Sequence, residues 1–109
     1  MDDELQRWVL SCTGAKGIRS VDTLQRLWSG YGHVHRVHLD GGAAPTLVLK
    51  VIDPPAAPTH PRGWNGAAGD ARKRRSYAVE ANWYRRQPLP APARTPRAVA
   101  IDARDGRTR

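Results

Sequence analysis

Thr46-Leu47-Val48-Leu49-Lys50-Val51-Ile52 is the clearest β-strand signal in this chain of 109 residues, because five of its seven side chains are aliphatic. The segment 34–39 upstream is also rich in β-forming residues, and Asp40-Gly41-Gly42 between the two is a typical turn sequence. Two such strands joined by a glycine-rich turn predict an antiparallel hairpin.

Lys50 is the one charged residue inside this aliphatic run. Strand alternation places it on one face with Val48 and Ile52, and places the remaining aliphatic side chains on the other face. We expect this strand to be covered on both faces, where a lysine is costly without an anionic partner. Taken alone, an exposed face or an edge strand explains the lysine more simply.

Upstream of the hairpin, residues 1–14 predict an N-terminal helix over 3–12, capped by Asp2 or Asp3 and ended by Gly14. Residues 21–28 fit either a helix or a strand. We treat residues 21–52 as one region that holds a glycine loop and the hairpin with the Lys50 strand. The glycine loop lies just before the hairpin and has the sequence Ser29-Gly30-Tyr31-Gly32. Glycines allow a backbone to turn tightly and to point N–H groups at a phosphate, although a glycine pair is usually only a turn.

Downstream, residues 54–69 hold four prolines and three glycines and predict a loop. Residues 70–87 predict a helix with Asp70 as its N-cap, ended by Pro88. Within this helix Glu80 is the only acid beyond the cap, and an ion pair within the helix is its simplest interpretation. Residues 88–109 predict a linker, a short strand at 96–101 and a polar tail.

Composition limits the function classes. Leu, Val and Ile make up 19 of 109 residues and Phe is absent, so we expect a thin core or an apolar face covered by something else. The net charge of +8 is compatible with nucleic acid, an anionic membrane surface or phosphate-bearing ligands. Single Cys12 excludes a disulfide framework. The acidic N-terminus and short apolar runs predict a soluble, cytoplasmic protein.

A glycine turn, then a strand lysine, then a helical glutamate is the order found in kinase N-terminal lobes. The motifs Leu27-Trp28-Ser29-Gly30-Tyr31-Gly32, the Lys50 strand, His60-Pro61-Arg62-Gly63-Trp64-Asn65 and Arg74-Arg75-Ser76-Tyr77-x-x-Glu80-x-x-Trp83-Tyr84 carry a more specific likeness. From about residue 20 to about residue 101, the chain resembles bacterial phosphotransferases of the choline-kinase-like and aminoglycoside-phosphotransferase superfamily, including its ecdysteroid-kinase-like branch.

The resemblance implies an α+β fold, namely a protein-kinase-like N-terminal lobe with the C-lobe absent. It implies a small antiparallel sheet of three to five strands, backed by one main helix, with a short helix at the N-terminus. By the same resemblance Lys50 would contact the ATP phosphates, Glu80 would be its ion-pair partner, and Ser29, Gly30, Tyr31 and Gly32 would form the phosphate loop. The segment 60–65 would lie in the connection to the Glu80 helix.

Two departures from the kinase pattern qualify the expected activity. The third glycine of a full protein-kinase loop is missing near His35. The Asp residues for catalysis and for Mg²⁺ belong to the second lobe, so no catalytic or metal-binding residue is expected in this chain. The string His38-Leu39-Asp40 has the letters of a catalytic loop but lies upstream of Lys50, at the end of a hairpin strand.

We therefore expect an ATP-binding lobe of a phosphotransferase that acts on a small-molecule hydroxyl, inactive as this isolated chain, with a C-terminal lobe as a partner in trans. One alternative is a basic nucleic-acid-binding module, in which Arg72-Lys73-Arg74-Arg75 and the nearby aromatic residues contact the nucleic acid. A second alternative is a vestigial truncated fragment without activity.

Overall fold

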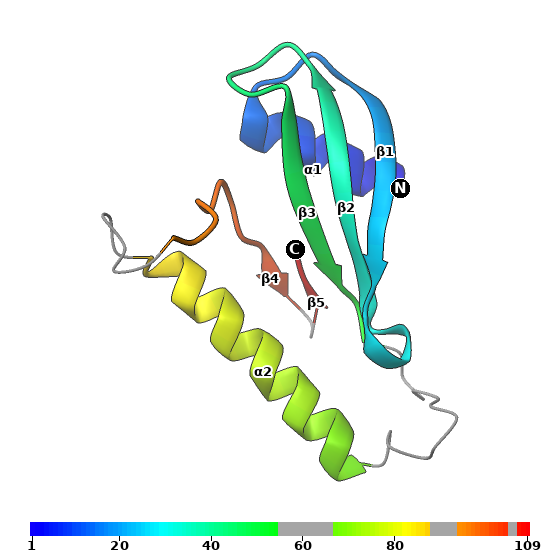
Figure 1. The fold of residues 1–109 in the computed structure, drawn as a ribbon, viewed down its shortest axis with the longest axis vertical. Coiled ribbons are helices and arrows are strands. Elements are labelled where there is room, and N and C mark those ends of the chain that lie inside the picture. The colour runs from blue at the N-terminus through cyan, green and yellow to red at the C-terminus, as the bar shows by residue number, and fades with distance from the viewer. Residues whose placement is uncertain (55–66, 88–93, 105–106) are drawn as a thin grey trace.

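The computed structural model of the chain describes residues 1–54, 67–87, 94–104 and 107–109, which form an α+β fold (Figure 1). Its antiparallel sheet has the strand order β1-β2-β3-β5-β4. The strands are β1 Gly17–Arg26, β2 Gly32–Asp40, β3 Thr46–Ile52, β4 Ala103–Arg104 and β5 Arg107–Thr108, and the helices are α1 Asp3–Thr13 and α2 Ala67–Arg85. A single 3-10 turn, Trp28–Gly30, joins β1 to β2. The predicted fold class is confirmed.

The predicted hairpin is formed by β2 and β3, with Val34 opposite Lys50 and His38 opposite Thr46. β1 pairs with the other edge of β2, so residues 21–26 belong to a strand that already begins at Gly17. Three consecutive strands thus bring the glycine turn and Lys50 into one sheet.

The main hydrophobic core lies between α1 and one face of this sheet. The Asp2 side chain caps α1 by accepting a hydrogen bond from the Leu5 amide (2.7 Å), and Gly14 ends the helix as predicted. The buried core side chains are Leu5, Val9, Val37, Leu39 and Leu49, against which Leu47 and Val51 also pack. The predicted alternation along β3 is therefore correct for the α1 face.

α2 runs obliquely past the lower half of the sheet, beside the β4–β5 hairpin (Figure 1). Ala81 is its only buried hydrophobic side chain among the described residues. The helix begins at Ala67, so residues 67–69 are helical instead of belonging to the predicted loop, and Asp70 lies in the first turn instead of capping it. The helix ends at Arg85, two residues before the predicted end.

The prediction of a strand at 96–101 is wrong. The Gln87 side chain donates a hydrogen bond to the Pro96 carbonyl (2.6 Å) and accepts one from the Ala98 amide (3.0 Å). Backbone groups of this segment therefore form hydrogen bonds outside the sheet. The strands form later, in what was expected to be a structureless tail, with Thr108 opposite Ile52. Arg109 holds this end of the chain through ion pairs to Glu4 and Asp102.

Candidate functional site

Lys50 and Glu80 form an ion pair that joins the sheet to α2. The Lys50 ammonium lies 2.8 Å and 2.9 Å from the two carboxylate oxygens of Glu80, thirty residues further along the chain. The side chains are 33% and 41% exposed, so the pair is accessible from solvent. A lysine on the α2 face of β3 and a glutamate on the inner side of α2 are thus brought together. Glu80 therefore pairs with a residue of the sheet, and not with an arginine of its own helix as the simplest interpretation had it.

The ring of Tyr77 lies beside the Lys50 ammonium, and a second lysine lies over the same ring. The Lys50 Nζ lies 5.2 Å from the centre of the Tyr77 ring, within range of a cation–π interaction. Lys73 lies over Trp28 and Tyr77 at 5.4 Å and 5.9 Å. Burial, and then the charge of Glu80, raise the pKa of Tyr77, so its hydroxyl stays neutral beside the pair.

Within the glycine turn, the Tyr31 amide already has a hydrogen-bond acceptor and is not free for a phosphate. The Tyr31 amide donates to the Trp28 carbonyl (3.1 Å), and the Gly32 carbonyl accepts from the Leu27 amide (2.8 Å). Gly32 has φ +148°, and a Cβ there would lie 1.8 Å from the Val51 carbonyl oxygen. Gly32 is therefore required for the close approach of β2 to β3. Gly30, by contrast, is exposed with open space around it.

Tyr31 was expected in the phosphate loop, but its side chain is completely buried and points away from solvent. Its ring lies against Trp28 and Tyr77, at centroid distances of 5.8 Å and 6.1 Å. Its hydroxyl donates a hydrogen bond to Asp70, which also accepts from Arg74. Tyr31 therefore fastens the turn to the first half of α2.

The pKa values of this cluster follow from its geometry. Burial, and then the hydrogen bond to Asp70, raise the pKa of Tyr31 to about 12. The same hydrogen bond, followed by that from Arg74, lowers the pKa of the Asp70 carboxyl. The cluster thus holds a neutral phenol and an ionised carboxylate at neutral pH.

The α2 face of β3 is only partly covered, contrary to the expectation that both faces would be. Val48 is 58% exposed, one alternation step from Lys50. β5 pairs with β3 only at Ile52, and along the rest of this edge lies a hollow of about 500 Å³. Val34, Val48, Lys50, Glu80 and Tyr84 line it, together with residues of α1 and the segment 96–101. An apolar surface therefore continues directly from the ion pair.

The other predicted features have mixed outcomes. His38 and Asp40 lie at the end of β2, where they pair with Asp22 and Arg19. The segment 60–65 and the side chain of Ser29 lie outside what the structure describes. Within the described ranges there is no group of three His, Cys, Asp or Glu side chains that could hold a metal ion.

Sequence reasoning missed Lys73 and Asp70 as neighbours of the site. Lys73 was hidden in a run of four basic residues, and Asp70 was taken for a helix cap. Their roles depend on how α2 is rotated about its axis against the sheet. The only sequence signal for that rotation is a set of residues spaced three or four positions apart, which share one helix face: Asp70, Lys73, Tyr77 and Glu80.

Comparison of the chain with protein-family models, with curated proteins and with solved structures gave no match. The described helices include none with the length and apolar character needed to cross a membrane. The site itself therefore has to support any functional proposal.

Proposed function

We propose that this chain is the ATP-binding lobe of a kinase-like phosphotransferase that acts on a small-molecule hydroxyl, and that it is inactive as the isolated chain. The observation that carries the proposal is the Lys50–Glu80 pair, formed between the third strand and the helix that follows it. Kinases need such a strand lysine, held by a helical glutamate, to position the phosphates of ATP.

The surroundings of the pair support a nucleotide better than a simple anion. Val34 and Val48 offer an apolar surface on which a flat base can lie, and the hollow of about 500 Å³ falls within the size range of ligand pockets. Phosphates extending from a base on that surface toward Lys50 would reach the ammonium. The Lys73 ammonium provides a second cation on the side of the glycine turn.

The residues of this chain would bind and orient the nucleotide without performing chemistry on it. Lys50 would hold phosphate oxygens, Glu80 would fix the direction of the ammonium, and exposed Gly30 would let a phosphate approach the backbone. Mg²⁺ would neutralise the developing charge during transfer, with ligands supplied from outside the described residues.

Binding of Mg·ATP to the isolated chain, measured by calorimetry, tests the proposal. Lys50→Met should weaken binding by about 1–3 kcal/mol, or roughly 5- to 150-fold, because a charge-assisted contact to the phosphates is lost. Lys16→Met is the matched control, because Lys16 is exposed and lies outside the hollow, and it should change affinity less than twofold. Equal effects of the two substitutions, or easily measured phosphotransfer by the isolated chain, would contradict the proposal.

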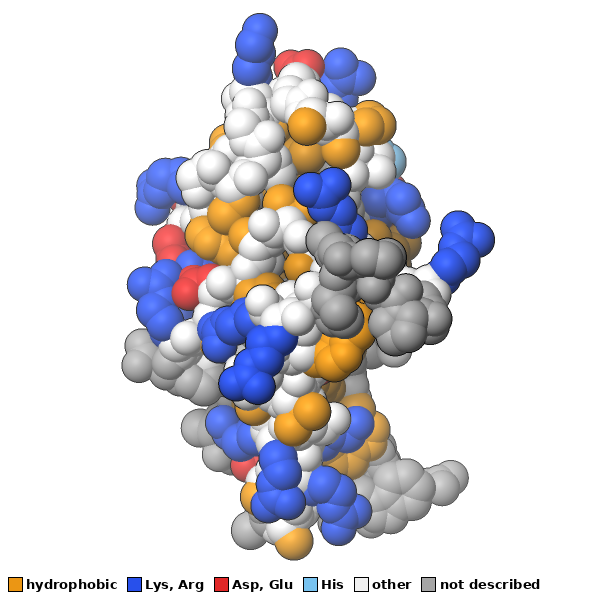
Figure 2. Space-filling view, turned by 90° about the vertical axis from the view of Figure 1, so that its left-hand side faces the viewer, with side chains coloured by type: hydrophobic (Ala, Val, Ile, Leu, Met, Phe, Trp, Pro, Cys, Tyr) orange, Lys and Arg blue, Asp and Glu red, His pale blue; other side chains and the backbone are white. Residues whose placement is uncertain are grey.

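The outer face of α2 favours one second candidate, a nucleic-acid-binding surface. Figure 2 shows basic side chains gathered on this side of the molecule. Arg72 and Arg75 of α2 and Arg86 just after it are exposed, and the α2 residue Trp83 is 40% exposed. Binding to single-stranded DNA that falls steeply with salt and is unchanged by Lys50→Met would support this candidate in place of the first.

A further inference from the structure

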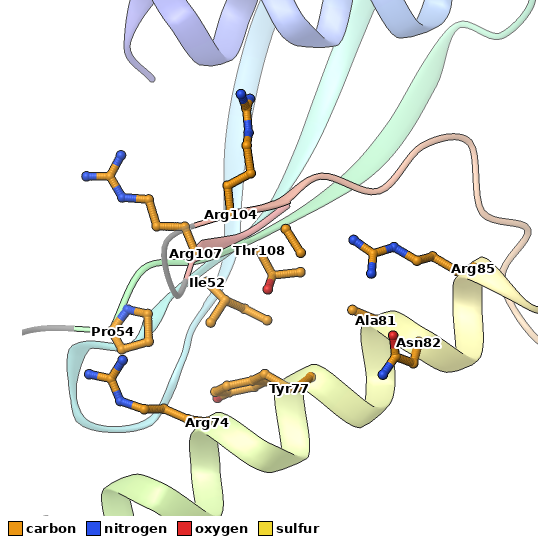
Figure 3. Close-up of a pocket in the computed structure, with 12 residues that line it drawn as sticks. Ile52, Pro54, Arg74, Tyr77, Ala81, Asn82, Arg85, Arg104, Arg107 and Thr108 are labelled. Atoms are coloured by element: carbon orange, nitrogen blue, oxygen red, sulfur yellow. The ribbon is translucent and has the colours of Figure 1, made fainter.

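A second hollow, of about 280 Å³, lies between α2 and the β4–β5 hairpin (Figure 3). Neither Lys50 nor Glu80 lines it, although it shares Ile52, Ala81 and Thr108 with the hollow beside that ion pair. The end of β3 forms one side through Ile52, and α2 forms the opposite side through Tyr77, Ala81, Asn82 and Arg85. Its volume is near the lower limit for ligand pockets, which suits a small molecule.

Four arginines border this hollow, and three of them already have acidic partners. Arg74 pairs with Asp70, Arg107 with Asp53, and Arg104 with Asp102. Two of these guanidinium groups, on Arg104 and Arg107, extend away from α2 in Figure 3. They therefore contribute little to a ligand inside the hollow.

Arg85 differs from the other three. It has no acidic partner among the described residues, and its side chain extends from α2 toward Thr108 on the opposite side of the hollow (Figure 3). Asn82, one helical turn earlier, is exposed, and its side-chain amide makes no hydrogen bond within the described part of the chain. The Arg85 guanidinium, the Asn82 amide and the Thr108 hydroxyl thus border one space, and each can donate a hydrogen bond to a ligand there.

The remaining walls are apolar. Ile52 and the ring of Tyr77 face the space from the sheet and from the helix, and Ala78 and Ala81 lie along the helix between them. A ligand that uses the whole hollow needs one anionic end and a short apolar body. The single unmatched guanidinium suits a small oxyanion head better than a polyphosphate chain.

We propose that this hollow binds a small organic acid, with its carboxylate or phosphate head held by Arg85, Asn82 and Thr108 and its apolar body against Ile52 and Tyr77. The proposal does not depend on ATP binding at Lys50. Because the site is half open to solvent, we expect a dissociation constant on the order of 1 mM.

The test is a titration of the ¹⁵N-labelled chain with benzoate and, separately, with phenyl phosphate, at constant ionic strength. Saturable shifts of the Arg85 and Asn82 side-chain signals are expected with at least one of the two acids. The stronger binder identifies the head group. Benzyl alcohol, which has the apolar body without the charge, should give no saturable shift.

Arg85→Gln should weaken acid binding at least fivefold. Arg86→Gln is the matched control: it removes the same charge one residue further on, from an exposed side chain that does not line the hollow, and should change affinity less than twofold. Equal losses in both variants would show general attraction to a basic surface and would overturn the proposal. So would the absence of any saturable shift in a wild-type chain shown to be folded by circular dichroism.

Lys50→Met separates this proposal from the nucleotide site. The variant should bind the acids with unchanged affinity, whether or not the wild-type chain binds Mg·ATP. If acid binding is lost in this variant, the anion binds at the ammonium of Lys50 instead, and the second site is refuted.

Discussion

Tyr31 shows how one residue connects the two halves of the candidate site. It sits between two glycines in a turn expected to contact phosphate, yet its ring is fully buried and its hydroxyl is bonded to Asp70 on α2. Its carbonyl also accepts a hydrogen bond from the Asp53 amide (2.8 Å), just after β3. One side chain and one peptide group thus link the turn, the lysine strand and the glutamate helix.

Tyr31→Phe should lower the free energy of unfolding at pH 7 by about 1.5–3 kcal/mol, because a part-buried hydrogen bond to a charged group is lost. Tyr84→Phe is the control: its ring is half-buried and its hydroxyl makes no hydrogen bond within the described residues, so a change within about 0.5 kcal/mol is expected. Urea denaturation measures both. Similar losses in the two variants would mean that the hydroxyl of Tyr31 contributes nothing specific.

The raised pKa of Tyr31 gives this contribution a defined pH range. Between pH 10 and about 12 the unfolded chain loses the phenolic proton while the folded chain keeps it, so rising pH favours unfolding. Stability from this group is therefore complete below pH 10 and is lost as the pH approaches 12. We expect the alkaline loss to be smaller in Tyr31→Phe, where Tyr77 is the remaining tyrosine with a raised pKa. Denaturation curves at several pH values across this range give the free energy of unfolding as a function of pH. If that free energy falls with pH equally steeply in both proteins, the assignment is refuted.

At the scale of elements, a helix or strand could be predicted when the residues that determine it lie within its own stretch of sequence. α1 and the β2–β3 hairpin carry their own caps, turn residues and apolar patterns, and the sequence predicted both. β1 is mostly exposed and has no alternating pattern, so residues 21–28 fit either a helix or a strand, and only pairing with β2 identifies residues 21–26 as a strand. β4 and β5 are two residues each and carry no apolar pattern, and an ion pair between Arg109, just after β5, and distant Glu4 helps to hold them in place.

The candidate site divides in the same way. Lys50 and Glu80 could be expected as a pair because a glycine turn, then a strand lysine, then a helical glutamate follow the order found in kinase N-terminal lobes. The burial of Tyr31 could not be predicted, because it depends on where the first turn of α2 lies relative to the glycine turn. That distance is set by tertiary packing and leaves no periodic signal in the sequence.

The two glycines of the turn should respond differently to substitution. Gly32→Ala forces a Cβ to 1.8 Å from the Val51 carbonyl and should separate β2 from β3, with a loss of more than about 3 kcal/mol. Gly30→Ala meets open space at φ +74° and should lose only about 1–2 kcal/mol, the cost of a left-handed backbone. Thermal melts of the two variants measure the difference. Equal melting temperatures would show that Gly32 is not needed for the strands to approach.

Across the whole molecule, the two helices are attached to the sheet by different forces. α1 buries Leu5 and Val9 in the main core, whereas α2 buries only Ala81 among the described hydrophobic side chains. α2 is held largely by polar links at two points, Tyr31–Asp70 and Lys50–Glu80. Part-buried polar links contribute less than buried apolar area, so α2 should open while the α1–sheet core stays folded.

Amide hydrogen exchange tests this difference in stability. We expect α2 amides to exchange with opening free energies at least about 2 kcal/mol below those of the β2 amides opposite β3. Glu80→Gln removes the charge of the second link while keeping its shape, and it should speed exchange throughout α2 without changing β2. Glu4→Gln is the control: it also removes a carboxylate from an ion pair, at the far end of the chain, and should leave α2 unaffected. If the amides of α2 and β2 exchange at the same rate, or if Glu80→Gln speeds exchange equally in both, the helix belongs to the same cooperative unit as the core. The Lys50–Glu80 pair is then not what holds α2 against the sheet.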